Sequence, residues 1–350
     1  MAEQAVRFYL PPELEAHQPA ELRGVRRDQV RLLVLPRLQG PMVHTQFDAL
    51  EEFLCPGDLL VVNTSRTLPA LLRAHDEGGK PVEVRLAHRR SDEVWDALLL
   101  DGRARRGRVH IGQAGMRLDF GQGLTARVEA RRPDLPFLWQ VHFDRCCIPL
   151  LDLIYRLGEP VRYGYVDKPL PIDLYQTVYA GEPGSVEMPS AGRPFTWQVL
   201  LKLKHQGIGL ASILLHTGLS STRDDQIDLT HPVYDEEYFV PEATAQAVNE
   251  AHGHGGRVIA VGTTVVRALE SAVQPDGRVE PARSLTCLHI TAEYRLKAVD
   301  ALLTGMHEPQ TSHLDLLSAF VSPPRLQAAY LEAIQRGYLW HEFGDVNLII

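Results

Sequence analysis

Short apolar runs alternate with amphipathic segments along most of the chain. Runs of about four apolar residues, such as 32–35 and 59–62, suit buried strands and fall far short of the roughly 18 residues of a membrane span. Strands are predicted at residues 31–35, 58–63, 210–216, 257–261, 285–290 and 346–350. Helices are predicted at residues 47–54, 197–205, 241–253, 263–271, 314–320 and 324–336. This alternation is typical of a mixed α/β domain.

Residues 69–135 follow a different pattern. Segments 82–86, 94–100 and 124–130 alternate apolar and polar positions, and glycine-rich turns separate them. Many short strands at this spacing indicate a small antiparallel β-barrel. The α/β pattern resumes afterwards, so the sequence predicts a mixed α/β main domain (1–66 and 150–350) with an inserted β-barrel domain (67–149).

Charge is unevenly distributed over the 350 residues. The net charge is −8, yet residues 66–145 hold 15 Lys and Arg against 11 Asp and Glu. The densest basic cluster comprises Arg103, Arg105, Arg106 and Arg108, beside a turn at Asp101-Gly102. A basic segment in an acidic chain points to a polyanionic partner, although ordinary surface scatter gives the same balance.

The cysteines and the N-terminal segment bear on the cellular compartment. The four cysteines form no CxxC spacing, which indicates reduced thiols and no structural zinc. No basic region followed by an apolar one opens the chain, so we expect a cytoplasmic protein. The motifs GxGxxG, GxxxxGK[ST], HExxH and GxSxG are absent, which removes the sequence support for Rossmann, P-loop, zincin and α/β-hydrolase sites.

Two segments are candidates for ligand binding. Gly262-Thr263-Thr264 lies between a predicted strand and a predicted helix, where free amides attract an anion, with Arg267 one turn further on. An ordinary helix capped by Thr263 or Thr264 has the same spacing. The long loop of residues 175–196 is rich in small and hydroxyl residues, which let backbone approach a ligand, and it also suits a structured connection.

Two histidines are candidates for proton chemistry. His216 ends an apolar strand, at the position where ligands bind in open α/β sheets, and His307 lies in a later loop. A structural histidine with its hydrogen bonds satisfied also fits both positions, and is the more common case.

At these residues the sequence resembles the S-adenosylmethionine:tRNA ribosyltransferase-isomerases of queuosine biosynthesis. The resemblance runs in order along nearly the whole chain. Its main segments are PGDLLVVN at 56–63, YQTVYA at 175–180, GSV at 184–186, LH at 215–216, RVIAVGTT at 257–264, SAF at 318–320 and GD at 344–345.

The resemblance implies the fold predicted above and a specific reaction. The family transfers the ribosyl unit of S-adenosylmethionine to 7-aminomethyl-7-deazaguanine at the wobble position of tRNA and rearranges it to an epoxycyclopentane. Adenine and methionine leave, and epoxyqueuosine is formed. S-adenosylmethionine is thus a co-substrate, the partner is a tRNA with a GUN anticodon, and no metal is implied. We expect a monomer without membrane contact.

The resemblance also suggests residue roles. His216 is expected to be the base that removes a proton beside the sulfonium, with His307 second. Tyr175 and Tyr179 are expected to stack on a base. Further contacts to S-adenosylmethionine are expected from Arg66, Gln176, Thr177, Ser185, Ser190, Thr196, Arg223, Thr263, Thr264 and Arg267. The basic cluster Arg103, Arg105, Arg106 and Arg108 is expected to bind tRNA phosphates.

Several polar loop positions depart from the family pattern. Pro194 replaces a histidine, and Thr64 replaces an acid. The family's FFSYGD segment becomes residues 340–345, WHEFGD. Two alternatives follow: a divergent paralog that uses S-adenosylmethionine on a small molecule, and a tRNA-binding homologue without catalysis.

Overall fold

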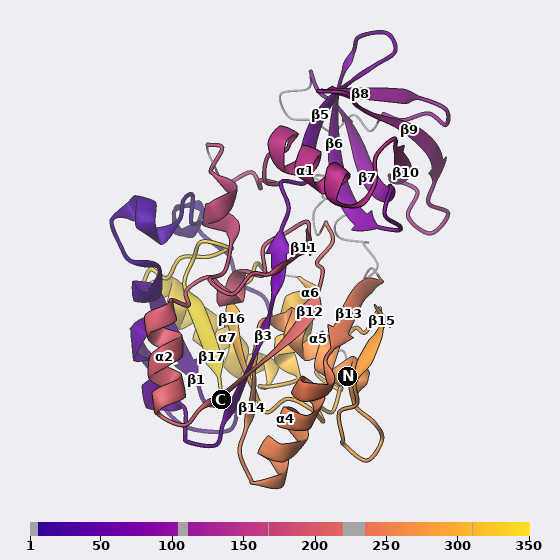
Figure 1. The fold of residues 1–350 in the computed structure, drawn as a ribbon. Helices are drawn as coiled ribbons and strands as arrows, with labels where there is room; N and C mark the ends of the chain where they lie inside the picture. Colours follow the sequence, from indigo (N-terminus) through magenta and orange to yellow (C-terminus); the bar gives the residue numbers. More distant parts are fainter. Residues whose placement is uncertain (1–5, 104–110, 167, 220–234, 310) are drawn as a thin grey trace.

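The computed structural model describes residues 6–103, 111–166, 168–219, 235–309 and 311–350. They form a mixed α/β domain built on a nine-stranded sheet, with a closed six-stranded antiparallel barrel at one end (Figure 1). The predicted fold class is confirmed. No helix in the described part of the chain has the length and apolar character to cross a membrane.

The sheet is parallel at its centre and antiparallel at its sides. In spatial order its strands are β15 (Ala282–Thr286), β13 (Glu236–Val240), β12 (Gly209–Leu215), β3 (Leu59–Asn63), β14 (Val258–Val261), β16 (Ala301–Gly305), β17 (Val346–Ile349), β1 (Arg31–Leu35) and β2 (Val43–Gln46). Strands β12, β3, β14 and β16 are mutually parallel, so their carboxyl ends meet at one edge. Because β17 and β1 run the opposite way, their amino ends lie at that same edge.

Helices cover both faces of the central strands. On β3, Leu59 and Val61 pack with α4 (Glu242–Gly253), α5 (Thr263–Ala272), α6 (Ser312–Ser318) and α7 (Pro323–Gln335). Leu60 and Val62 pack on the other face with α2 (Trp197–His205) and the 3₁₀ helix η4 (Phe47–Phe53). Burial on both faces explains why β3 is continuously apolar instead of alternating.

The barrel is inserted directly after β3, through the short strand β4 (Ser65–Thr67). Its strands are β5 (Leu71–Asp76), β6 (Pro81–Arg89), β7 (Val94–Asp101), β8 (Arg117–Gly121), β9 (Leu124–Arg131) and β10 (Leu138–Phe143), followed by α1 (Cys147–Leu157) against the barrel. Buried and exposed positions alternate along β8 and β9, and the core includes Leu118, Phe120 and Val128 from these strands. Since β3 leads into the barrel, the barrel lies beyond the carboxyl edge of the sheet (Figure 1).

Loops of the main domain complete the barrel core. Val186, after β11 (Glu182–Ser185), and Leu219, after β12, are buried among the barrel's apolar side chains. A Cβ on Gly218 would lie 2.2 Å from His88 Nε2 of β6, so only glycine allows this approach. The barrel is therefore packed onto the loops that end β11 and β12.

The predicted elements match the structure with few exceptions. Helix α2 has the predicted bounds, and the predicted helix at 47–54 is the 3₁₀ helix η4. The strand predicted at 285–290 is wrong, because β15 ends at Thr286. The backbone carbonyls of Thr286 and Leu288 instead accept hydrogen bonds from Arg267. The predicted threonine cap of α5 is also wrong, because Gly262 holds the N-cap position at φ +94°.

The Asp58–Arg257 pair ties the start of β3 to the start of β14. Asp58 is buried and accepts from the backbone amides of Cys55 and Arg257 and from the Arg257 guanidinium. Burial alone would raise the pKa of Asp58, but these hydrogen bonds lower it below its ordinary value.

We predict that Asp58→Asn lowers the free energy of unfolding by about 1–3 kcal/mol at neutral pH, because it removes the charge that Arg257 pairs with. A depressed pKa stabilises the fold only above the ordinary carboxyl range, so the difference from the parent should shrink as pH falls toward 3. Urea unfolding measured across pH checks this. The control is Asp152→Asn, which breaks an exposed pair with Arg156 and should change little.

Candidate active site

Four loops converge at the carboxyl edge of the parallel strands. They follow β12 at His216, β3 at Thr64, β14 at Gly262 and β16 at Met306. In open α/β sheets ligands bind outside this edge, because backbone groups and loop side chains there are free of the sheet. The topology therefore places His216, the Gly262 turn and His307 along one edge, although they are far apart in the sequence.

Asn63, the last residue of β3, joins the ends of β3 and β12 to the first turn of α5. Its side chain donates to the Leu215 carbonyl at 2.8 Å and accepts from the Leu215 amide at 3.1 Å. The same oxygen accepts from the Ser65 amide at 3.1 Å, and Nδ2 also lies 3.3 Å from Thr264 Oγ1. Asn63 is buried, so these bonds fix the ends of β12 and β3 relative to α5.

His216 lies between the β3 and β11 ends. Its Nδ1 is 2.7 Å from Ser65 Oγ, which is 2.6 Å from Ser185 Oγ. Its ring covers Gly184, where a Cβ would come within 2.5 Å of the imidazole. Burial lowers the pKa of His216 to about 4, against the opposing effect of Glu237, so the ring is neutral at physiological pH.

The Gly262 turn leads into α5. The positive φ of Gly262 suits glycine, and Ala191 of η6 (Ser190–Gly192) lies against it, 3.4 Å from where a Cβ would stand. Thr263 and Thr264 occupy the first turn of α5, where helix geometry leaves backbone amides without intrahelical acceptors. These amides and the helix dipole favour a bound anion.

His307 belongs to a pair of stacked imidazoles. Its Nε2 lies 2.7 Å from Thr304 Oγ1, and its ring stacks on His313 with centroids 4.5 Å apart. Burial, with the neighbouring His313, lowers the pKa of His307 well below its ordinary value. Burial also lowers the pKa of His313, to about 4. Both rings are therefore uncharged at neutral pH.

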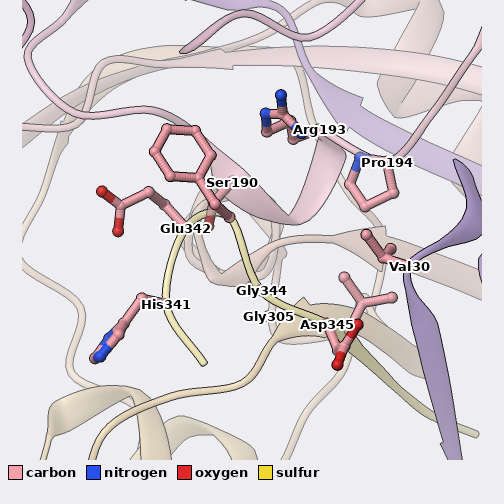
Figure 2. Close-up of a pocket in the computed structure, with 11 residues that line it drawn as sticks. Val30, Ser190, Arg193, Pro194, Gly305, His341, Glu342, Gly344 and Asp345 are labelled. Atoms are coloured by element: carbon pink, nitrogen blue, oxygen red, sulfur yellow. The ribbon is translucent and has the colours of Figure 1, made fainter. Parts of the chain in front are cut away.

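A small cavity opens at the same edge, between β16, β17 and η6. It is lined by Val30, Ser190, Arg193, Pro194, Gly305, His341, Glu342, Phe343, Gly344, Asp345 and Val346. Figure 2 shows His341 and Glu342 at one end of the cavity and Val30 and Asp345 at the other. Buried Arg193 spans the top, donating to Glu21 at 2.8 Å and to the Leu174 carbonyl at 2.9 Å.

His341 and Glu342 were not among the sequence candidates. His341 has a φ of +72°, unusual for a residue with a side chain, and its ring stacks 3.8 Å from that of Tyr165. Its Nδ1 is 3.1 Å from Glu308, and the Tyr165 hydroxyl donates to Glu342. Burial raises the pKa of Glu342 to about 7. The one available signal was that both residues replace apolar or small ones in the family's FFSYGD segment.

The loop candidates have mostly structural partners. Gln176 exchanges hydrogen bonds with the Thr67 backbone, and Thr196 caps α2 while donating to Asp28. Tyr175 is buried edge-on against Phe343. Two more, Thr177 and Tyr179, pack against Gly192, while Ser190 lines the cavity and Ser185 bonds Ser65.

The arginine candidates are separated in space. Arg267 donates to Glu236 and to the carbonyls of Thr286 and Leu288, so its donors are engaged by the protein. Arg66 lies over the ring of Tyr155, and Arg103 is exposed in its turn. The candidates Arg105, Arg106, Arg108 and Arg223 lie outside the described residues.

Comparisons with known proteins give one family. A sequence profile described as "Queuosine biosynthesis protein" matches residues 3–349. The chain is 40% identical, over 98% of both sequences, to a Moorella thermoacetica protein named S-adenosylmethionine:tRNA ribosyltransferase-isomerase, and 38% identical to its Thermus thermophilus namesake over 99% of both. The crystal structure of a Thermotoga maritima S-adenosylmethionine tRNA ribosyltransferase is 31% identical, covers 99% of both chains and gives a TM-score of 0.54.

The raised pKa of Glu342 predicts a pH-dependent stability. The folded protein holds a proton on Glu342 up to a pH near 7, whereas the unfolded chain, in which this carboxyl has a pKa near 4.5, releases it at a lower pH. The contribution of Glu342 to the free energy of unfolding should therefore fall as pH rises from about 4.5 to about 7, by about 1–3 kcal/mol. Glu342→Gln should remove this fall in urea unfolding measured at pH 5 and pH 8. The exposed Glu52→Gln is the control, and an equal pH dependence in the parent and Glu342→Gln would refute the assignment.

Proposed function

The chain belongs to the queuosine biosynthesis protein family, as a transferase and isomerase, and we propose that it transfers the ribosyl unit of S-adenosylmethionine to tRNA. The acceptor in this proposal is 7-aminomethyl-7-deazaguanine at the wobble position of a tRNA with a GUN anticodon. The products are epoxyqueuosine, adenine and methionine. The reaction places the protein in the cytoplasm, and S-adenosylmethionine is consumed as a co-substrate.

The full-length similarity to relatives of one name carries the proposal. The carboxyl edge of the sheet supports it chemically. The sulfonium of S-adenosylmethionine makes the adjacent C5′ protons acidic, so the reaction needs proton-handling groups in a site shielded from water. Two neutral histidines, His216 and His307, and a carboxyl that holds its proton near neutral pH, Glu342, lie at this edge.

The first turn of α5 suits the negative end of S-adenosylmethionine. In the proposed complex, the amides of Thr263 and Thr264 receive the methionine carboxylate. Ser190 lines the cavity, beside the Ala191 that lies against Gly262, and offers a hydroxyl to the sugar or the base. Arg66 lies at the passage from the sheet to the barrel, where a tRNA phosphate would approach.

The barrel suits the tRNA. It lies beyond the carboxyl edge, it carries the basic excess of the chain, and its core includes residues from the loops beside His216. A tRNA bound along the barrel would therefore present its anticodon loop to the site. Phosphate contacts of this kind supply affinity without reading sequence.

Two substitutions relative to the family pattern favour considering a second function. Pro194 and Thr64 stand where the family has a histidine and an acid. Pro194 lines the cavity, and Thr64 follows β3 at the carboxyl edge. A paralog acting on a small molecule with S-adenosylmethionine would fit this change, and so would a tRNA-binding protein without catalysis.

We predict adenine release when the protein is incubated with S-adenosylmethionine and tRNA that carries the aminomethyl-deazaguanine. Chromatography of free adenine measures the reaction, with unmodified tRNA as control. Equal release without the modified tRNA would favour the small-molecule alternative. Binding of both substrates without any release would favour the non-catalytic one.

We predict that replacing Arg103, Arg105 and Arg106 by alanine weakens tRNA binding and flattens its salt dependence. Each lost phosphate contact should reduce the log–log slope by about one unit at most. Filter binding at several salt concentrations measures this. Parent-like affinity at every concentration would show that the cluster does not contact tRNA.

A further inference from the structure

A buried chain of hydroxyl groups ends at His216. The Thr217 amide lies 3.1 Å from Ser185 Oγ, Ser185 Oγ lies 2.6 Å from Ser65 Oγ, and Ser65 Oγ lies 2.7 Å from His216 Nδ1. Ser185 is 0% exposed and Ser65 is 1% exposed, so water does not compete for these groups. The hydroxyl protons of Ser185 and Ser65 must therefore be donated to acceptors within this series of hydrogen bonds.

The direction in which these hydrogen bonds are donated follows from the first donor, the Thr217 amide. A backbone amide only donates, so Ser185 Oγ accepts from Thr217. Among the described residues, Ser65 Oγ is then the one acceptor in reach of the Ser185 hydroxyl. Ser65 in turn has its own proton to place, and His216 Nδ1 is the acceptor that remains for it. The opposite direction would leave the buried Ser185 proton without an acceptor, which is costly.

This direction fixes the tautomer of the imidazole. An Nδ1 that accepts from Ser65 carries no proton, so the neutral ring holds its proton on Nε2. Gly184 supports the face of the ring, and Nε2 has no hydrogen bond to any residue in the described part of the chain. The charged groups around the ring are Glu237, Arg89 and Arg283. Burial, together with the two arginines, outweighs Glu237 and keeps the ring neutral.

We propose that His216 is a catalytic hydrogen-bond donor, with its Nε2–H directed at a substrate nitrogen or oxygen that gains electron density as adenine leaves. This rests on the proposed function and reverses the base role expected from the sequence. A neutral imidazole donor stabilises developing charge without giving up its proton, so the ring needs no reprotonation between turnovers. Removal of the C5′ proton then falls to another group at the edge.

The tautomer is measurable without substrate. In protein labelled with ¹⁵N-histidine, long-range ¹H–¹⁵N spectra distinguish a proton on Nε2 from one on Nδ1, and the His216→Asn spectrum assigns the signal. We expect Nε2–H from pH 6 to pH 8, and a mixture of tautomers in Ser65→Ala, which loses the donor to Nδ1. A proton on Nδ1 in the parent would overturn the proposal.

Two substitutions separate a donor from a base. A glutamine at position 216 places an amide N–H near the Nε2 position, whereas an asparagine is too short to do so. We expect the single-turnover rate of adenine release to fall about 10²–10³-fold in His216→Asn. The rate of His216→Gln should be at least tenfold higher than that of His216→Asn. If His216 were the base, both variants would lose activity equally, because neither amide accepts a proton.

Controls keep the outcomes distinct. His205→Asn, exposed at the end of α2, should leave the rate unchanged, and thermal unfolding should show that both variants at position 216 are folded. A parent that releases no adenine would refute the proposed function, whereas an active parent with equally impaired Asn and Gln variants would refute the donor role.

Discussion

The buried side chain of Asn63 is the constraint on which the site depends. It engages both backbone groups of Leu215, the Ser65 amide and Thr264 Oγ1, so it joins two strand ends and one helix start. A buried amide has no other partners to exchange for these, and breaking one bond leaves a polar group unsatisfied. The positions of Ser65, of His216 beside Leu215 and of the α5 amides follow from this one side chain.

The barrel and the site form one packed unit. Val186 and Leu219, on loops that border His216, are buried in the barrel core, and Gly218 lies directly against His88. A ligand that shifts the barrel must therefore move the loops beside His216, because close-packed interiors transmit displacement. This packing gives a physical reason why the barrel is inserted directly after β3.

Burial sets the charge state of the site. It lowers the pKa values of His216, His313 and His341 to about 4, so these imidazoles are neutral at physiological pH, and it raises the pKa of Glu342 to about 7. In the proposed complex, these three imidazoles would add no positive charge beside the sulfonium. Neutral groups of this kind act through hydrogen bonds whose direction the surrounding structure decides.

The sequence by itself determined the mixed α/β class, the barrel texture and the positions of α2, α4–α7 and five strands of the sheet, because apolar periodicity is a local property that survives folding. It also marked His216 and the Gly262 turn, since each follows a predicted strand, and His307 as a loop histidine. It did not predict β2, β13 or β16. It missed His341 and Glu342, whose importance comes from Tyr165 and Glu308, neighbours distant in the chain. It also could not show that Arg267 is engaged by Glu236 or that Thr196 caps α2 beside Asp28. Only the tertiary structure decided these contacts, because hydrogen-bond partners and burial arise when separate elements pack together.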